Sequence, residues 1–419
     1  MQLRNRIPQL KRFSWLIAVV FVASLLVTLL FWRILPANFQ VNENSDYDGF
    51  YEPTARNILE GRGFILKDGA LAIRYPPGYP LLLAGTLELS DLLGIPEEIA
   101  LSAFTLLGLG LSSVFLFSLA RSVWRPLPAL ISSLVWMTYP FTLWLTKQPN
   151  SELPFMVIFY GGFYLFWYSL LHKSRAWPVY FLSGLLIGFA MLIRPIAIGV
   201  GFVMGAILWI ADRDMMANSR LFLINMLLLG TLVAILPWQV WIFSNTGAVV
   251  LLSVGGVPSV LDGLTFALNS PGYRQEIPIP RDVVSLMQDI FVRESELNSL
   301  GSIISAMTKQ LETQPLTVAK LFIIKAARSW YATDSGRFET LILLIQTAYL
   351  VPVLWGSWTA WKQGGDAKRL TIGIWLMVLY FWGMTILVLS ILRYMVPVMG
   401  LLFVVLPASF FNRASKKLF

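Results

Sequence analysis

The sequence predicts an all-α integral membrane protein, and two observations carry the prediction. Of its 419 residues, 57% are hydrophobic and 13% are charged, whereas a soluble globular domain usually has roughly 25% charged residues. Apolar runs of about twenty residues, the length that crosses ~30 Å of hydrocarbon as a helix, recur from one end of the chain to the other. We therefore expect a bundle of about ten transmembrane helices.

The expected helices are taken in chain order. The first, residues 13–35, is too long for the apolar part of a signal peptide and lacks a small-residue cleavage site, so we expect it to be retained. Residues 76–94 open with a proline-rich stretch and carry Glu88 and Asp91, which favours a juxtamembrane or shallow re-entrant segment. The other crossings are expected at residues 99–120, 126–146, 152–171, 178–193, 196–212, 220–243, 338–361, 369–390 and 394–411.

The net charge of +9 is distributed in short basic clusters between apolar runs. No basic stripe along a soluble domain is present, so we expect no nucleic-acid partner and attribute the charge to the positive-inside rule. With a cytoplasmic amino terminus, the clusters all fall on the cytoplasmic side, and the carboxyl terminus lies there too. These clusters are Arg121 and Arg125, residues 172–175, Arg213 and Arg220, residues 362–369, and Arg413, Lys416 and Lys417.

This topology leaves two long loops on the outer face, residues 36–98 and 244–337. We divide the chain into an amino-terminal membrane module with the first outer loop (1–243), the second outer loop (244–337) and carboxy-terminal helices (338–419). Long loops on a rigid scaffold commonly carry function. Within the second loop, the pattern of residues 316–331 predicts an interfacial helix. An alternative role for its Lys320, Lys325 and Arg328 is contact with a lipid phosphate.

The first outer loop contains an acidic stretch, SDYDGFYEPTARNILEGRGF, at residues 45–64. Its spacing predicts an amphipathic helix at the membrane surface that stops near Gly61 and Gly63. The apolar face comprises Tyr47, Tyr51, Ala55 and Ile58, and the polar face comprises Asp48, Glu52, Arg56 and Glu60. Ser45 and Asp48 also fit an S-x-x-D capping pattern, which is the structural alternative to a functional role.

The same stretch resembles the first outer loop of the GT-C membrane glycosyltransferases, in the branch of protein O-mannosyltransferases and bacterial aminoarabinose transferases. The resemblance lies in an acidic residue followed by Tyr51, Ala55-Arg56-Asn57, Gly61-x-Gly63-Phe64 and RYPPGYP at residues 74–80. Further similar segments follow in the same order, namely SELPF (151–155), GLLIGFAMLIRP (184–195), LPWQVWIFSNTG (236–247) and RYMVP (393–397).

The resemblance implies a GT-C-like bundle in the bacterial inner membrane. It implies transfer of a sugar from a polyprenyl-phosphate donor to a glycan, lipid or protein acceptor on the periplasmic face, amid membrane lipids. An aspartate of the first loop then serves as general base. The family pattern is Asp-Glu with a tyrosine about four residues after the aspartate. Here no Glu follows Asp46 or Asp48. We prefer Asp48, which shares the polar face with Glu52, a further catalytic candidate, and keep Asp46 in reserve.

The reaction also needs groups that neutralise the departing phosphate, for which arginine has a suitable bidentate fork. Arg74, Arg194 and Arg393 are the candidates, with snorkelling of the arginines to the interface as the alternative. Glu152 begins a helix at the outer side, where N-capping by Asn150 or Ser151 is the competing explanation. Tyr79 and Tyr394 complete the expected substrate-binding set.

A divalent cation, Mg²⁺ or Mn²⁺, is left open, with Asp46 and Asp48 as the oxygen ligands it would use. The chain has no cysteine, which excludes disulfides and thiolate metal sites. It also has no P-loop or dinucleotide fingerprint, which argues against nucleotide-driven chemistry.

Two other function classes fit a chain with many membrane helices. An O-antigen-type polymerase or ligase would rely on arginines of the second outer loop and would not need the acidic first-loop helix. A transporter would carry charges in the middle of helices or paired broken helices. The expected crossings are almost free of such charges, which makes transport the least favoured function.

Overall fold

A computed structural model describes residues 7–39, 45–212, 215–268 and 276–411. The predictions that concern Arg213, Arg413, Lys416, Lys417 and residues 1–6 lie outside these described residues. Over the described ranges the chain is almost entirely helical and forms no β-strand, only an isolated antiparallel bridge between Ile65 and Leu71. The all-α fold class is therefore confirmed.

Six helices of the described chain are long and apolar enough to cross a membrane. They are α1 (Ile7–Ile34), α4 (Glu97–Arg121), α7 (Glu152–Leu171), α10 (Ala217–Thr246), α15 (Glu339–Gln363) and α16 (Gly365–Leu387). Each coincides with a predicted crossing, so a multi-pass membrane protein is confirmed.

The other predicted crossings contain shorter apolar helices. These are α5 (Pro126–Thr138) with α6 (Pro140–Leu145), α8 (Trp177–Ile193), α9 (Val200–Ala211), and α17 (Val396–Phe403) with α18 (Pro407–Phe410). Pro140 explains one interruption, because a proline disfavours helical geometry at the preceding Tyr139, which is extended. The count of about ten crossings remains a prediction.

Glycines allow the central helices to approach closely. A Cβ at Gly184 of α8 would lie 1.8 Å from the Leu227 carbonyl oxygen of α10, and one at Gly230 of α10 would lie 2.1 Å from that of Phe181. Small residues of this kind let membrane helices pack backbone against backbone. Helix α8 also packs on α7, and α7 packs on α4, so a tight central group carries the segments that bear Glu152 and Arg194.

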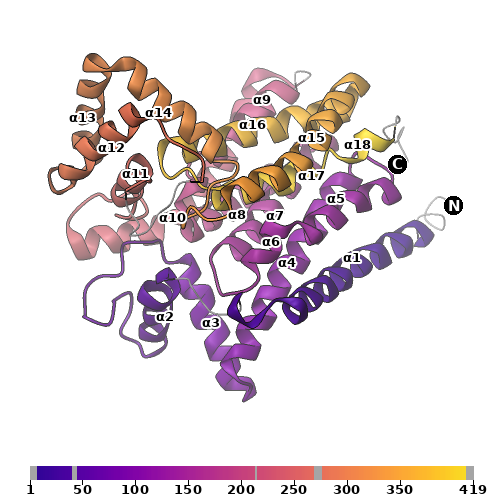
Figure 1. Cartoon of the computed structure of the whole chain (residues 1–419). Coiled ribbons are helices and arrows are strands. Elements are labelled where there is room, and N and C mark those ends of the chain that lie inside the picture. Colours follow the sequence, from indigo (N-terminus) through magenta and orange to yellow (C-terminus); the bar gives the residue numbers. More distant parts are fainter. Residues whose placement is uncertain (1–6, 40–44, 213–214, 269–275, 412–419) are drawn as a thin grey trace.

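Both outer loops gather on one side of the molecule. In Figure 1 the helices of the loops, α2 (Glu52–Leu59), α3 (Gly78–Leu93) and α11 to α14, lie at the left, while the start of α1 and α18 lie at the right. Residues 76–94, expected to stay out of the bundle, form the 16-residue helix α3. The arrangement agrees with a topology in which the two loops share a face.

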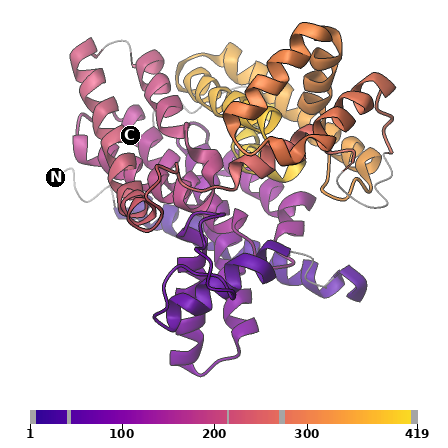
Figure 2. The ribbon, with the colours of Figure 1, turned by 90° about the vertical axis from the view of Figure 1, so that its left-hand side faces the viewer.

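The second outer loop is a helical subdomain, which is more structure than the single helix predicted there. It comprises α11 (Gly256–Leu264), α12 (Arg281–Val292), α13 (Leu300–Thr313) and α14 (Pro315–Arg328), grouped at the upper right of Figure 2. Its members bury a core of their own that includes Val283, Leu286, Met287, Ile303 and Leu321. Burial of such apolar area stabilises the subdomain independently of lipid.

Helix α14 confirms the helix predicted over residues 316–331, but two of its three cations are not at the surface. Lys325 and Arg328 are buried. The alternative role of these two residues, contact with a lipid phosphate, is therefore wrong. Only Lys320 is exposed, with its Nζ 2.7 Å from the Asp282 carboxylate.

Lys325 joins the subdomain to the membrane helices. Its Nζ donates a hydrogen bond to the Val388 carbonyl oxygen, 3.1 Å away, just after α16. Burial disfavours the ammonium form and lowers the pKa of Lys325 to about 7. The unfolded amine keeps a pKa near its ordinary 10.5, so between these two values the unfolded chain binds more protons and stability rises with pH.

We expect Lys325→Met to raise the thermal unfolding midpoint in detergent micelles at neutral pH by a few degrees. The gain should shrink as the pH rises toward and above the ordinary value of 10.5, because only above that value is the amine neutral in both states. Lys320→Met, which removes an exposed amine from the same helix, is the control and should change the midpoint little. An equal gain at neutral and alkaline pH would contradict the assigned titration.

Candidate active site

A buried carboxylate between two arginines forms the centre of the site. The side chain of Glu152 is 1% exposed, and its Oε1 lies 2.6 Å from an Nη of Arg194 and accepts a hydrogen bond from Nε of Arg393. Arg194 and Arg393 retain 13% and 29% exposure, so a ligand can reach them. The trio carries one net positive charge, and Oε2 of Glu152 is buried without a hydrogen-bond partner among the described residues.

Local structure holds the trio in place. The Asn150 side chain accepts hydrogen bonds from the backbone N–H groups of Glu152 and Leu153, so Asn150 provides the capping that competed as an explanation for Glu152. Glu152 is therefore free to pair with the arginines. Ser151 Oγ accepts a hydrogen bond of 3.0 Å from Arg194, whose guanidinium also stacks on the Tyr394 ring at 5.0 Å.

The turn after Arg194 is fixed by a tyrosine of another helix. Pro195 ends α8, and the Tyr380 hydroxyl of α16 donates to the Ile196 carbonyl and accepts from the Gly199 N–H, each at 2.7 Å. A Cβ on Gly199 would come within 2.4 Å of the Tyr380 ring, so only glycine allows this contact.

The acidic stretch of the first loop has the predicted helical faces. It forms a π-helical turn at Tyr47–Tyr51, which continues into α2. Tyr47, Tyr51 and Ala55 are buried, whereas Asp48, Arg56 and Glu60 are exposed. The helix ends as predicted, since Gly61 and Gly63 have φ of 74° and 81°, values that favour glycine.

Asp46 lies at the edge of an aromatic cluster beside the arginines. The Tyr75 hydroxyl donates a 2.9 Å hydrogen bond to its carboxylate. The Tyr51 ring contacts those of Tyr75 and Tyr79 at centroid distances of 5.2 and 4.8 Å. Burial raises the pKa of Tyr51, Arg194 opposes the rise, and Asp46 and Glu152 add to it. Tyr51 is thus within electrostatic reach of both the acid and the arginine groups.

Asp48 and Glu52 belong to a different group of charges. Glu52 pairs with Arg56 at 2.7 Å, and Arg56 also pairs with Glu97 at 2.8 Å. Burial, together with the charges of Glu52, Glu97 and Asp48, raises the pKa of Tyr47 to about 12. Asp48 was preferred because it shares a helix face with Glu52, but that face belongs to this exposed charge cluster. The carboxylate beside Tyr51 and Tyr75 is that of Asp46.

Backbone contacts join the two outer loops at the site. The Val254 N–H donates to the Ile73 carbonyl at 3.0 Å, and the Gly255 N–H donates to the Arg74 carbonyl at 3.1 Å. The Arg74 side chain is exposed and lies over the Tyr75 ring, 5.4 Å from its centroid. Arg74 and Tyr79 therefore lie in the same cluster as Asp46, and their substrate-binding role stays a prediction.

One acidic residue near the contact of the two outer loops was not predicted from the sequence. Asp334, in the loop between α14 and α15, interacts electrostatically with Arg393, Glu152 and Asp46. Surrounding protein atoms raise the pKa of its carboxyl, although part of the side chain remains exposed to solvent. A polar Asp-Ser-Gly turn directly before an apolar helix was the signal that could have revealed it. A similar signal, an acidic residue at the end of a predicted crossing, made Glu152 a candidate in the sequence analysis.

The described residues do not form a set of metal ligands. Within the part of the chain that the structure describes, no three His, Cys, Asp or Glu side chains gather to hold an ion. Asp46 accepts from Tyr75, and Asp48 faces the other charge cluster. A hard cation such as Mg²⁺ normally requires several oxygens at one point.

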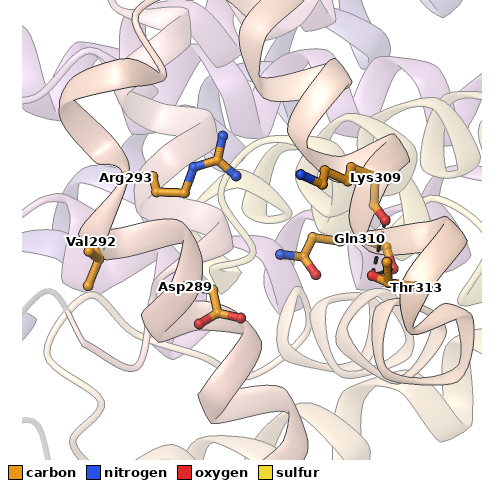
Figure 3. Close-up of a pocket in the computed structure, with 6 residues that line it drawn as sticks. All are labelled: Asp289, Val292, Arg293, Lys309, Gln310 and Thr313. Atoms are coloured by element: carbon orange, nitrogen blue, oxygen red, sulfur yellow. Dashed lines mark hydrogen bonds between the residues drawn. The ribbon is translucent and has the colours of Figure 1, made fainter.

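A separate hollow of about 330 Å³ lies in the outer subdomain, between α12 and α13. Figure 3 shows Arg293 and Lys309 pointing toward one another across it, with Asp289 and Gln310 nearby. None of the predicted site residues lines this hollow, so it is not part of the arginine and carboxylate cluster.

Comparison with known proteins supports the fold. Residues 74–241 match the sequence profile of the family described as dolichyl-phosphate-mannose-protein mannosyltransferase. No curated protein sequence matches the chain. The matched range begins at Arg74 and contains Glu152 and Arg194.

Solved structures with the same fold include the archaeal oligosaccharyltransferase AglB from Archaeoglobus fulgidus in complex with an inhibitory peptide and a dolichol-phosphate. The identity is 11%, the TM-score is 0.53, and the match covers 94% of this chain and 50% of that one. An Archaeoglobus fulgidus oligosaccharyltransferase tethered with an acceptor peptide gives 13% identity and a TM-score of 0.52, with 93% and 49% covered. The chain thus spans about half the length of these structures.

We expect Glu152→Gln to destabilise the protein by about 3 kcal/mol, because it leaves two partly buried guanidinium groups without a counter-charge. The measurement is thermal or denaturant unfolding in detergent micelles. Glu52→Gln is the matched control and should cost less than about 1 kcal/mol, since its pair with Arg56 is screened by solvent. Equal effects of the two changes would contradict a structural role for the buried trio.

Proposed function

We propose that this chain, which has the GT-C fold of membrane glycosyltransferases, transfers a sugar from a polyprenyl-phosphate donor to an acceptor on the outer face of the membrane. One observation carries the proposal: the Asp46 carboxylate and the Glu152–Arg194–Arg393 trio flank the same aromatic cluster. A base and a phosphate-binding cation are the two groups that this transfer needs at one point. The family match over residues 74–241 supports the same chemistry.

In the proposed reaction the acceptor hydroxyl attacks the anomeric carbon of the donor. Asp46 takes the hydroxyl proton as the new carbon–oxygen bond forms, and the bond from the anomeric carbon to the phosphate oxygen breaks. The bond electrons leave with the polyprenyl phosphate. Because Glu152 neutralises only one of the two guanidinium charges, Arg194 and Arg393 retain a net positive charge that stabilises the departing phosphate.

Asp46 rather than Asp48 is the proposed general base. Its hydrogen bond from Tyr75 fixes the carboxylate, and its side chain is only partly exposed. The second oxygen of the carboxylate then remains available to the acceptor. Positioned acid–base catalysis usually contributes roughly 10²–10⁴-fold, so the arginines supply much of the remaining rate enhancement.

The other function classes receive less support. An O-antigen-type polymerase or ligase would use arginines of the second outer loop. There Arg328 is buried in a bidentate pair with Glu339, and Arg293 is paired with Glu296. A transporter has no comparable supporting observation.

We expect Asp46→Asn to lower turnover by about 10²–10⁴-fold, because the amide cannot accept the acceptor proton. Purified protein is given undecaprenyl phosphate esters of mannose, glucose and galactose, and release of undecaprenyl phosphate is measured. Asp48→Asn is the direct competitor and should lose less than about tenfold. A larger loss for Asp48→Asn reverses the assignment, and full activity of both variants removes the first loop from catalysis.

The orientation is tested by cysteine labelling, since the natural chain has no cysteine. Gly49→Cys is suitable because Gly49 is exposed and a Cβ there would meet no atom within 4 Å. In intact spheroplasts we expect an impermeant maleimide to label Gly49→Cys. Ala176→Cys, in the exposed turn between α7 and α8, should be labelled only after lysis. The reverse pattern would contradict an outer location.

A further inference from the structure

An apolar groove of about 350 Å³ lies between α9 and α10, away from the candidate active site. Its lining residues on α9 recur every three or four positions, so they form one face of that helix, and α10 provides the opposite side. The lining residues are Phe202, Gly205, Ala206, Trp209 and Ile210 of α9 and Ile224 of α10. None of them carries a charge, so the groove itself suits a hydrocarbon chain.

Small residues form the floor of the groove and large ones form its walls. Gly205 is buried, and a Cβ there would lie 3.1 Å from Cγ2 of Ile224, so α9 and α10 approach closely at this point. The side chains of Phe202, Trp209 and Ile210 are exposed. From residue 202 to residue 210 a helix rises about 12 Å, which is close to the roughly 15 Å of hydrocarbon in one leaflet. The groove therefore has the length of one acyl chain.

An arginine at one end of the groove is held by a residue of its lining. Arg220 lies in the first turn of α10, and its guanidinium stacks on the Trp209 ring at 4.4 Å. One Nη of Arg220 donates a 2.9 Å hydrogen bond to the Trp209 carbonyl oxygen. A guanidinium has five N–H donors, and this bond uses one of them. Because the Arg220 side chain is only half-buried, its other donors can reach a ligand.

One donor of Arg220 is buried without an acceptor. Its Nε has no hydrogen-bond partner among the residues that the structure describes. A buried donor that lacks an acceptor is costly, and a bound ligand or water normally supplies one. The guanidinium is thus fixed in position by Trp209 but not satisfied by the protein around it.

The start of α10 adds to the attraction for an anion at the same place. The first turn of this 30-residue helix has no acidic residue, and Met216 at the N-cap makes no side-chain hydrogen bond. The free backbone N–H groups and the dipole at such a helix start favour a negative group. The helix start and Arg220 therefore select a ligand of the same sign of charge.

Chain direction puts this cation at the membrane face opposite the Glu152 trio. Arg194 directly precedes the apolar segment Pro195–Ala211, whereas Arg220 follows it. A headgroup at Arg220 therefore belongs to the other leaflet. We propose that the groove binds an anionic phospholipid, with its phosphate at Arg220 and the start of α10 and one acyl chain along the exposed face of α9. Basic sites between membrane helices bind anionic headgroups through the same two interactions.

Native mass spectrometry of the full chain in detergent micelles tests the proposal. The protein is titrated with palmitoyl-oleoyl phosphatidylglycerol or with the matching phosphatidylcholine, and lipid-bound species are counted. We expect wild type to bind phosphatidylglycerol about fivefold more tightly or better, because its phosphate charge is not neutralised within the headgroup. Arg220→Gln should remove this preference. Arg125→Gln, which removes an exposed arginine at the start of α5, is the matched control and should keep it.

A second variant tests the groove and leaves the cation in place. Ala206 is exposed, so Ala206→Trp fills the groove without entering the core. We expect Ala206→Trp to weaken phosphatidylglycerol binding about tenfold, because the acyl chain loses its apolar contacts. Leu229→Trp, at an exposed position of α10 outside the groove, is its control and should change binding less than about twofold. Glycerol phosphate, which has the anion without acyl chains, should not displace the lipid.

Equal binding of the two phospholipids by wild type overturns the inference, as does a preference that survives Arg220→Gln. Unchanged binding by Ala206→Trp also overturns it, because the acyl chain would then lie elsewhere. Displacement by glycerol phosphate overturns it in favour of a soluble phosphate. Competition by undecaprenyl phosphate that is equal in wild type and Arg220→Gln assigns the groove to the proposed donor instead. None of these measurements requires sugar transfer, so their outcome is independent of the proposed function.

Discussion

The contact between Glu152 and the two arginines organises the site because its members come from three distant parts of the chain. Glu152 begins α7, Arg194 follows α8, and Arg393 precedes α17. Opposite charges that are removed from bulk water attract strongly, so the start of α7, the end of α8 and the start of α17 are held next to one another. The interaction also leaves one net positive charge, on which the proposed binding of a phosphate rests.

The two outer loops add residues to the site whose centre lies at the ends of the membrane helices. The first loop supplies Asp46, and the second supplies the segment that supports Arg393 through the Ala332 carbonyl. Neither loop is an independent appendage, because backbone hydrogen bonds join them at Arg74 and Gly255. The part of the site formed by the loops is therefore held by backbone hydrogen bonds as well as by side chains.

Much of the fold was predictable because apolar length and helical period are local properties. The faces of the acidic helix, its stop at Gly61 and Gly63, and the six long crossings all follow from such patterns. The burial of Lys325 and Arg328 was not predictable, because it depends on a subdomain core formed by residues far apart in sequence. The position of Asp334 near Arg393 was not predictable either, because it depends on the contact of Ala332 with Leu392, which is also non-local.

The docking of residues 388–393 against the outer subdomain has a consequence for biogenesis. Gly263 of α11 allows close approach to the Val388 carbonyl, and Lys325 donates a hydrogen bond to that oxygen. The Ala332 carbonyl accepts a hydrogen bond from the Leu392 N–H. Arg393 is consequently oriented only once the subdomain has folded and the final helices have been inserted by the translocon. A nascent chain that already exposes its acidic helix therefore lacks the completed Glu152–Arg194–Arg393 trio until the last helices are in place.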